Sequence, residues 1–400
     1  MNTPRINIVL FVLYFLLAIG VLIASIVSPT VRAYSYAPLR DLILPPPQPI
    51  VVKLLSSTEK DAWLKEVISR YEADNPVYQG RPIQVSTVMM GSREIYLSVL
   101  NGEQKPTLIS PAGSLQTTIL ENLSASKNGT PMVQAKDSGS CQSVLKSPLV
   151  LVAWKERAEA VWGTQPLPDL WKKVHDLAVD PKGWATYNHP DWGYFKFGHT
   201  NPLSSNSGFM TILLMTYNYF SKTNGLTSGD ILSNKGYSDW FLGLEGSISQ
   251  FGESTGTYMR DLVAYGPSKY DMVTVYESNA IEQADNAVGR YGELRFYYPP
   301  ATITSDHPFC VLHADWVKPE EAAAGKIFID YLLTRDSQEL ALLKYGFRPA
   351  LAGIPLDQAG SPFTRYTANG LSITLPPEAD IPSGDVLNTL LDFWNRNNHR

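Results

Sequence analysis

The chain has 400 residues, of which 44% are apolar and 18% are charged, and its formal net charge is -5. This apolar fraction supports a hydrophobic core and excludes a globally disordered chain, while the length suggests two domains or lobes. The negative charge argues against nucleic acid as the main partner, because nucleic-acid binding rests on clustered lysine and arginine.

The N-terminal segment, residues 1–33, is dominated by an apolar run. Residues 7–27 are almost all apolar and are flanked by Arg5 and Arg32. Such a run is long enough to cross a bilayer as a helix. Two interpretations stay open: a secretory signal peptide cleaved after Ala33, or a retained membrane anchor, which the length of the run favours. Either one predicts an extracytoplasmic protein that is membrane-anchored, secreted or periplasmic.

A proline-rich stretch at residues 34–49 predicts a semi-rigid linker, and the folded part begins at Ile50. Short apolar runs then alternate with amphipathic segments, and this order predicts an α/β fold with a mostly parallel sheet. We expect strands at 50–55, 82–89, 107–110, 147–154, 271–275, 293–298 and 308–313. We expect helices that include 63–71, 93–100, 168–178, 209–220, 319–334, 336–345 and 386–395.

One motif raises the possibility of an enzyme. Residues 252–256 read Gly-Glu-Ser-Thr-Gly, the nucleophile-elbow pattern of serine hydrolases, and Asp306 and His307 follow in the chain order of a triad. However, residues 246–251 are too polar and too short for the buried strand that precedes an elbow. Side chains of adjacent residues also diverge, so Asp306 is badly placed to orient His307. We therefore expect no enzyme, with a serine hydrolase using Ser254 as an alternative.

Other chemical motifs are weak. Residues 57–60 read Ser-Thr-Glu-Lys and match the S-x-x-K pattern of penicillin-binding enzymes, but the partner motifs K-T-G and S-D-N are missing, so we interpret the match as chance. The six histidines lack ligand spacing and there is no phosphate-binding glycine loop, so we expect neither a metal nor a cofactor. Cys141 and Cys310 are the two cysteines; an exported chain could pair them, and two buried free thiols are the alternative.

Polar loops recur directly after expected strands and directly before expected helices. Such loops gather at the carboxyl ends of strands, where open α/β sheets bind ligands, and helix N-termini favour anions. Helix capping explains any single loop better, but the recurrence in both halves of the chain favours a shared ligand site. The loops are Ser56–Thr58, Gly91–Ser92, Ser110, Ser204–Ser207, Ser254–Thr255 and Tyr276–Ser278.

Several short motifs carry a resemblance to a known family. They are Leu54–Glu59, Ser147–Leu151, Phe197–Pro202 with Ser205–Gly208, Val275–Glu277, Tyr298–Pro300, Asp306–Phe309 and Tyr345–Pro349. In this order the chain resembles bacterial extracytoplasmic solute-binding proteins of the type II periplasmic-binding-protein fold, closest to the molybdate/sulfate-like branch of ABC-transporter substrate-binding proteins. The resemblance covers the chain from Ile50 to its C-terminus. It implies two lobes, each a mostly parallel sheet flanked by helices, joined by a two-strand hinge.

The resemblance also implies domain boundaries and site residues. Lobe one would comprise residues 50–153 plus 310–400, and lobe two residues 154–309. This topology supports a disulfide between Cys141 and Cys310. No Arg or Lys lies in the polar loops, so neutral donors would hold the ligand, and Glu277 would repel an oxyanion unless it were protonated or paired with a cation. The ligand-binding residues carried over are Ser57, Ser92, Asn206, Ser207, Ser254, Thr255, Tyr276 and Glu277.

We therefore expect a monomer that encloses a small polar solute, with an oxyanion as one candidate, for ABC-type uptake or sensing. Its partners would be the solute, the membrane through residues 7–27, and an ABC transporter permease or another envelope protein. Glu277 and the aromatic residues at 184–194 leave a sugar, a peptide or a cation open as the solute. A degenerate fold that serves as a non-binding envelope scaffold is a further alternative.

Overall fold

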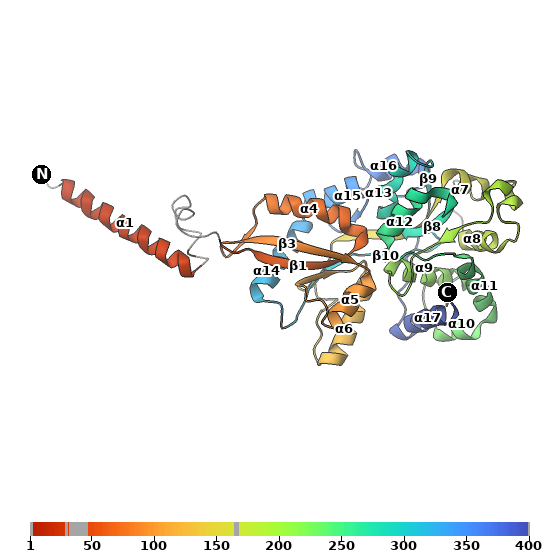
Figure 1. Cartoon of the computed structure of the whole chain (residues 1–400), viewed down its shortest axis with the longest axis horizontal. Coiled ribbons are helices and arrows are strands. Elements are labelled where there is room, and N and C mark those ends of the chain that lie inside the picture. The colour runs from red at the N-terminus through yellow and green to blue at the C-terminus, as the bar shows by residue number, and fades with distance from the viewer. Residues whose placement is uncertain (1–2, 29–30, 32–46, 164–167, 399–400) are drawn as a thin grey trace.

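The structure, a computed structural model, describes residues 3–28, 31, 47–163 and 168–398. Most of the predicted linker and the cleavage position after Ala33 lie outside these residues. Helix α1 (Thr3–Val27) projects away from the rest of the molecule (Figure 1). Its stretch Ile8–Ser25 is apolar and long enough to span a membrane. A signal peptide and an anchor share this property, so both interpretations remain.

The first of two sheets has the strand order β2-β3-β1-β4-β11-β5. Its strands are β1 (Ile50–Ser57), β2 (Val77–Tyr78), β3 (Arg81–Met90), β4 (Leu108–Ser110), β5 (Cys141–Ser143) and β11 (Pro308–Val311). Strand β1 is parallel to β3 and β4, because a helix returns the chain between successive strands. Strand β11 comes from a distant part of the chain and is antiparallel to both β4 and β5.

Five helices cover this sheet on its two faces. They are α4 (Asp61–Ala73), α5 (Ser92–Leu100), α6 (Ser114–Asn128), α14 (Pro319–Leu332) and α15 (Arg335–Tyr345). Helices α4, α14 and α15 share one core with β1, and α5 and α6 share another. The predicted apolar stripe of α4 is buried at Trp63, Leu64, Val67 and Tyr71. We call the first sheet with these five helices the first lobe.

The second sheet is built around the long strand β6 (Leu145–Trp154). The other strands are β7 (Phe197–Gly198), β8 (Met272–Tyr276), β9 (Leu294–Tyr297), β10 (Thr304–Ser305) and β12 (Arg348–Pro349). Among these described strands only β7 and β8 pair in parallel, and β6 is antiparallel to β8, β9, β10 and β12. The mostly parallel pairing predicted for both sheets is found only at the centre of the first, where β1 pairs with β3 and β4; the outer pairs of that sheet are antiparallel, and in the second sheet β6 enters from the first lobe and later strands return along it.

Helices of the second half pack on this sheet, and we call sheet and helices together the second lobe. They are α7 (Lys155–Val161), α8 (Leu170–Val179), α9 (Asn206–Tyr219), α10 (Ser228–Ser233), α11 (Lys235–Ser247), α12 (Thr255–Tyr265), α13 (Glu277–Val288) and α17 (Gly384–Asn397). Helix α9 is buried almost all round, as its continuous apolar sequence predicts. Residues 310–400 are predicted to belong to the first lobe, but α17, within this range, packs on α9 and α10, and Trp394 donates to Glu245 at 2.6 Å.

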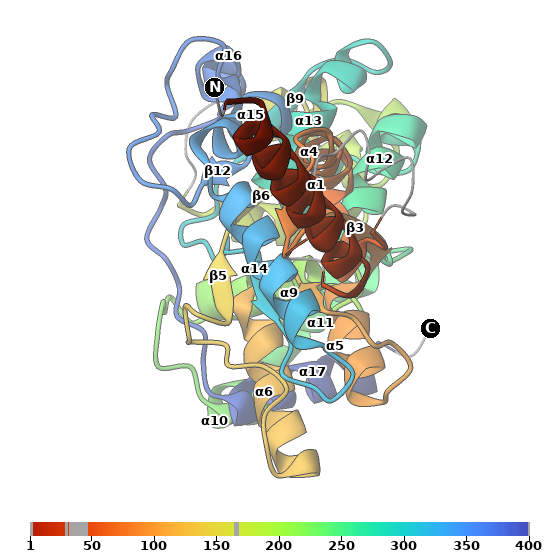
Figure 2. The same ribbon diagram turned by 90° about the vertical axis from the view of Figure 1, so that its left-hand side faces the viewer.

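The two lobes meet along the start of β6. Strand β12 pairs with residues 145–146 of β6 and β10 pairs with residues 147–148, so three chain segments pass between the lobes at this point. Figure 1 shows the first lobe next to α1 and the second lobe at the far end, and Figure 2 views the molecule from the α1 side. The short helices outside the two sheets are η1 (Thr58–Lys60), η2 (Gly183–Tyr187), η3 (Pro190–Trp192), η4 (Gly266–Ser268), α16 (Pro362–Arg365) and η5 (Thr367–Asn369).

Candidate functional site

Helices from both lobes begin at the junction, and their backbones approach closely there. A Cβ atom at Gly91, directly before α5, would lie 2.8 Å from the carbonyl oxygen of Ser204 before α9. A Cβ atom at Gly256 in α12 would lie 2.9 Å from the carbonyl oxygen of Thr58. A side chain at either position would clash with a backbone carbonyl of the other lobe, so glycine at both positions allows the two backbones to approach closely.

Asn206, the first residue of α9, connects the lobes through hydrogen bonds. Its Oδ1 accepts from Gln116 Nε2 of α6 at 2.9 Å, and its Nδ2 donates to the Tyr276 hydroxyl at 2.8 Å. All three side chains are buried. Burial, reinforced by the charge of Glu59, raises the pKa of Tyr276 above its ordinary value, so its phenol stays protonated. One amide thus satisfies a buried group from each lobe.

A cluster of neutral hydroxyl groups lies at the N-termini of α9 and α12. Ser207 Oγ is 2.6 Å from Thr255 Oγ1 and 2.8 Å from Thr200 Oγ1, and Ser205 Oγ lies 3.4 Å from both Ser207 and Thr255. Each hydroxyl can donate and accept, so the members satisfy one another without a charge. We call Thr200, Ser205, Ser207 and Thr255 the hydroxyl cluster.

A charged cluster lies at the end of β1. Lys60 Nζ donates to Ser57 Oγ at 2.5 Å and to Glu59 Oε1 at 3.0 Å, and Ser57 Oγ donates to the same Glu59 oxygen. His307 Nδ1 lies 3.4 Å from both Lys60 Nζ and Glu59 Oε1. The side chains of Lys60 and Glu59 are 0% and 3% exposed. We call Ser57, Glu59, Lys60 and His307 the charged cluster.

The electrostatics of the charged cluster follow from its burial. Burial alone would raise the pKa of Glu59, but Lys60, His307 and Ser57 together hold that pKa well below its ordinary value. Burial lowers the pKa of Lys60, and the carboxylate of Glu59 opposes this effect. Burial and the neighbouring Lys60 also lower the pKa of His307, which favours a neutral ring. The cluster therefore places the Lys60–Glu59 contact of 3.0 Å beside an imidazole whose pKa burial lowers.

The remaining predicted residues have partners elsewhere. Ser92 Oγ accepts from the Ala112 backbone N–H at 3.0 Å, and Ser254 Oγ donates to Thr257 at 3.0 Å. Glu277 forms a two-pronged pair with Arg348, with both N···O distances 2.8 Å. This pair supplies the cation that Glu277 was predicted to need.

The structure adds a cation to the predicted polar loops. The loop Ser56–Thr58 itself holds no Lys, as predicted, but Lys60 follows Ser57 by three residues and donates to Ser57 Oγ. The S-x-x-K spacing that we interpret as chance was the signal for this contact, since it brings Ser57 Oγ and Lys60 Nζ together. Gln116 and Glu59 were also missed, because a polar residue inside a helix ordinarily faces solvent.

The hydrolase alternative finds no support in the described contacts. Ser254 bonds to Thr257, whereas Asp306 Oδ1 accepts from the Ser114 backbone N–H at 2.7 Å. His307 lies beside Glu59 and Lys60 instead. A triad requires the nucleophile, base and carboxylate in one hydrogen-bonded chain, and these three residues use different partners.

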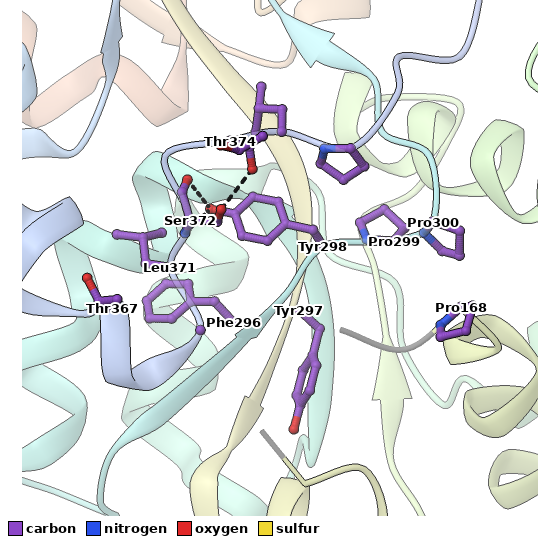
Figure 3. A pocket seen from close by; sticks show the side chains of 13 residues that line it. Pro168, Phe296, Tyr297, Tyr298, Pro299, Pro300, Thr367, Leu371, Ser372 and Thr374 are labelled. Atoms are coloured by element: carbon purple, nitrogen blue, oxygen red, sulfur yellow. Dashed lines mark hydrogen bonds between the residues drawn. The ribbon is translucent and has the colours of Figure 1, made fainter. Parts of the chain in front are cut away.

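A cavity of about 500 Å³, which none of the eight predicted residues lines, lies between β9 and the C-terminal tail (Figure 3). Figure 3 shows Tyr298, Pro299 and Pro300 on one side and Leu371 on the other. The Tyr298 hydroxyl donates to Glu277 and accepts from the Ser372 N–H at 3.1 Å. The wall of the cavity is therefore connected, through Tyr298, to the Glu277–Arg348 pair.

Two further features concern cysteines and metals. Cys141 of β5 and Cys310 of β11 form a disulfide inside the first lobe. Among the described residues, no three His, Cys, Asp or Glu side chains are grouped to hold a metal ion.

Several solved structures with a similar fold are described as binding proteins. A periplasmic thiamin binding protein has a TM-score of 0.60 and 11% identity, covering 88% of this chain and 96% of its own. Apo ferric ion-binding protein A from Pasteurella haemolytica has a TM-score of 0.56 and 13% identity, covering 87% and 98%. The sulfate-binding protein SubI from Mycobacterium tuberculosis H37Rv has a TM-score of 0.51 and 17% identity, covering 84% and 96%.

These similarities establish the fold. The chain has the α/β, two-sheet architecture of type II periplasmic binding proteins, as the sequence predicts. No protein-family model and no curated protein sequence matches the chain. The three structures differ in what they bind and are similar to this chain to nearly the same degree, so they do not resolve a branch of the fold.

Proposed function

We propose that the chain is an extracytoplasmic solute-binding protein of an ABC transporter. The observation that carries this proposal is the Gln116–Asn206–Tyr276 connection, which joins two lobes where several helix N-termini meet. Converging N–H groups and hydroxyls form a polar site that suits a small solute. The similar structures support this function, since their descriptions name thiamin, ferric ion and sulfate as what they bind.

In this proposal the eight predicted residues line the solute site. Each of them is no more than 8% exposed, so the lobes must part before a solute can reach them. The strands at the junction, near residues 145–148, 304–305 and 348–349, would act as the hinge, and α17 would move with the second lobe.

The finer parts of the proposal come from the sequence. The motif order favours the molybdate/sulfate-like branch and an oxyanion as the solute. Helix α1 would export the chain or hold it at the membrane as a monomer, from where the closed lobes could engage a permease. The converging helix N-termini support an anionic solute, because their unpaired N–H groups carry partial positive charge.

One observation favours a second candidate, the non-binding envelope scaffold. Every predicted solute residue is buried and bonded to another group of the chain, as the hydroxyl cluster and the Glu277–Arg348 pair illustrate. A junction that satisfies its own polar groups could hold two lobes in one fixed arrangement without a guest.

A solute screen separates the two candidates. We would measure the melting temperature of the full chain in detergent against oxyanions, sugars, peptides and thiamin, and titrate any hit by calorimetry. A solute that binds only the folded state at 100 times its Kd stabilises it by about 2.7 kcal/mol. Asn206→Ala should weaken the binding, and Asn234→Ala, at the start of α11, should not. If no solute shifts the melting temperature, the scaffold is the better description.

A further inference from the structure

The ion pair of Glu59 and Lys60 is an unusual occupant for the junction between the lobes. Its two charges are almost completely removed from solvent, at 3.0 Å from each other. Taking a charge out of water is costly and is tolerated only with close partners. Both side chains follow directly after β1, at the position where the sequence predicts that a solute should meet Ser57.

Three buried polar atoms around this pair have no hydrogen-bond partner among the described residues. They are Ser110 Oγ, Asn279 Oδ1 and His307 Nε2. Each residue also lies next to the charged cluster: Ser57 Oγ is 3.2 Å from the Ser110 carbonyl oxygen, Asn279 Nδ2 is 3.5 Å from the Glu59 carbonyl oxygen, and His307 is a member of the cluster. Buried polar groups are hydrogen-bonded in most folded proteins, so these unpartnered atoms on residues beside the charged cluster support a site that can accept a further polar group.

His307 adds a second sign of a functional site. Its φ of 39° lies in the left-handed region, which is strained for a residue with a Cβ atom. Its backbone N–H donates to the Ala112 carbonyl at 3.0 Å, and its ring nitrogen Nδ1 lies 3.4 Å from Lys60 Nζ. His307 therefore reaches Lys60 from a segment other than the one that carries Lys60. Strained residues persist where the surrounding structure enforces them, and they concentrate at binding and catalytic sites.

We propose that Lys60 is the cation that binds an anionic group of the solute. In the absence of solute, the Glu59 carboxylate occupies the position of that anionic group and pairs with Lys60. This inference rests on the proposed function and names the chemistry of its site. Ser57 and Lys60 hold the internal carboxylate through an O–H and an N–H donor, the kinds of donor that a solute carboxylate or tetrahedral oxyanion requires. Because the three N–H donors of Lys60 already point to Ser57, Glu59 and the Pro111 carbonyl, the solute displaces Glu59, and the solute-free chain closes on its own side chain.

A set of variants in the full chain, purified in detergent, tests this substitution of one anion by another. Glu59→Ala removes both the carboxylate and its volume, whereas Glu59→Gln removes the charge and keeps the volume. Lys60→Met in the Glu59→Ala background removes the cation. Asp239→Asn, in the exposed pair with Lys235, controls for general salt effects. The measurement is the melting temperature in sodium acetate and in sodium sulfate, at constant ionic strength set with chloride.

We expect acetate, sulfate or both to raise the melting temperature of Glu59→Ala, with a midpoint concentration at least tenfold lower than for the wild type. The control should follow the wild type, and Glu59→Gln should respond less than Glu59→Ala because its side chain still fills the space. A response to acetate alone identifies a carboxylate-bearing solute, and a response to sulfate alone identifies a tetrahedral oxyanion. The response should vanish in the double variant that lacks Lys60.

The proposal is overturned if Glu59→Ala responds to neither anion beyond the control, or if the double variant responds equally. If Glu59→Ala does not fold in chloride, refolding in acetate or sulfate answers the same question, and failure in both salts again overturns it. A different outcome contradicts the proposed function alone. In that outcome the wild-type chain binds no solute, whereas Glu59→Ala still gains anion binding.

Discussion

The two lobes bring different chemistry to the same junction. The first lobe contributes the charged pair of Glu59 and Lys60, which is buried beside Ser57. The second lobe contributes the hydroxyl cluster, in which Ser207 and Thr255 bond to each other without any charge. Both arrangements satisfy buried polar groups, but only the first depends on keeping two opposite charges together.

This difference predicts how each side responds to damage. A neutral hydroxyl that loses one partner still has neighbours in the cluster, so the penalty is small. A buried charge that loses its counter-ion has no comparable substitute, because the low local dielectric makes an isolated charge costly. Substitutions on the first-lobe side of the junction should therefore lower the free energy of unfolding more than substitutions in the hydroxyl cluster.

The largest expected effect comes from Lys60→Met. This change leaves the Glu59 carboxylate buried without its cation, and removing one partner of a buried ion pair costs about 3–5 kcal/mol. Urea unfolding of the full chain in detergent measures the loss. The double variant Glu59→Gln with Lys60→Met should recover most of it, because no unpaired charge remains. A loss below about 1 kcal/mol for Lys60→Met would show that the first-lobe side is not the sensitive one.

Removal of the disulfide should have the next largest effect and should act on the first lobe. Cys141 and Cys310 are 169 residues apart in sequence, and their bond closes a long loop between β5 and β11. Replacing both by alanine should cost about 2–5 kcal/mol, which urea unfolding with and without reductant on the wild type should reproduce. Identical unfolding curves in both conditions would contradict this expectation.

Asn206→Ala is expected to cost about 2–3 kcal/mol, because it leaves the Gln116 amide and the Tyr276 hydroxyl buried without their shared partner. The matched change in the hydroxyl cluster, Ser207→Ala, should cost only about 1 kcal/mol. Thermal unfolding of both variants gives the comparison. A reversed order would mean that the hydroxyl cluster, not Asn206, is the main connection across the junction.

The smallest effect is a pH dependence within the first lobe. Hydrogen bonds from Lys344 and Tyr345 of α15 lower the pKa of Glu66 in α4 to about 2, against 4.5 for a free glutamate. Because the folded-state pKa is the lower one, this stabilisation is complete above pH 4.5 and is lost as the pH falls towards 2. Glu66→Gln should therefore flatten the decline of stability in this window, and Asp239→Asn serves as the exposed control. Parallel declines in wild type and Glu66→Gln would rule out the assigned role.

The sequence predicted the architecture well for physical reasons. Local periodicity identified α4 through its buried stripe, and the continuous apolar run identified α9 as a fully buried helix. Polar residues after strands correctly marked helix starts at Ser92, Asn206 and Glu277. Capping and amphipathicity are properties of a few neighbouring residues, so a single sequence contains them.

The pairing of these residues could not be predicted in the same way. Arg348 pairs with Glu277 across 71 positions, and His307 reaches Glu59 across 248 positions. Adjacent Glu59 and Lys60 have the composition of an exposed helix start, which is why their burial was missed.

By itself, the sequence determined an apolar N-terminal helix, an α/β order of elements and a set of polar helix starts, because each depends on short-range patterns. Only the tertiary structure decided that β6 runs antiparallel to its neighbours, that α17 packs on the second lobe, and that Lys60 lies inside the junction. Those outcomes depend on which distant segments bury each other's surface and charge, and the free energy of that burial is a property of the whole fold.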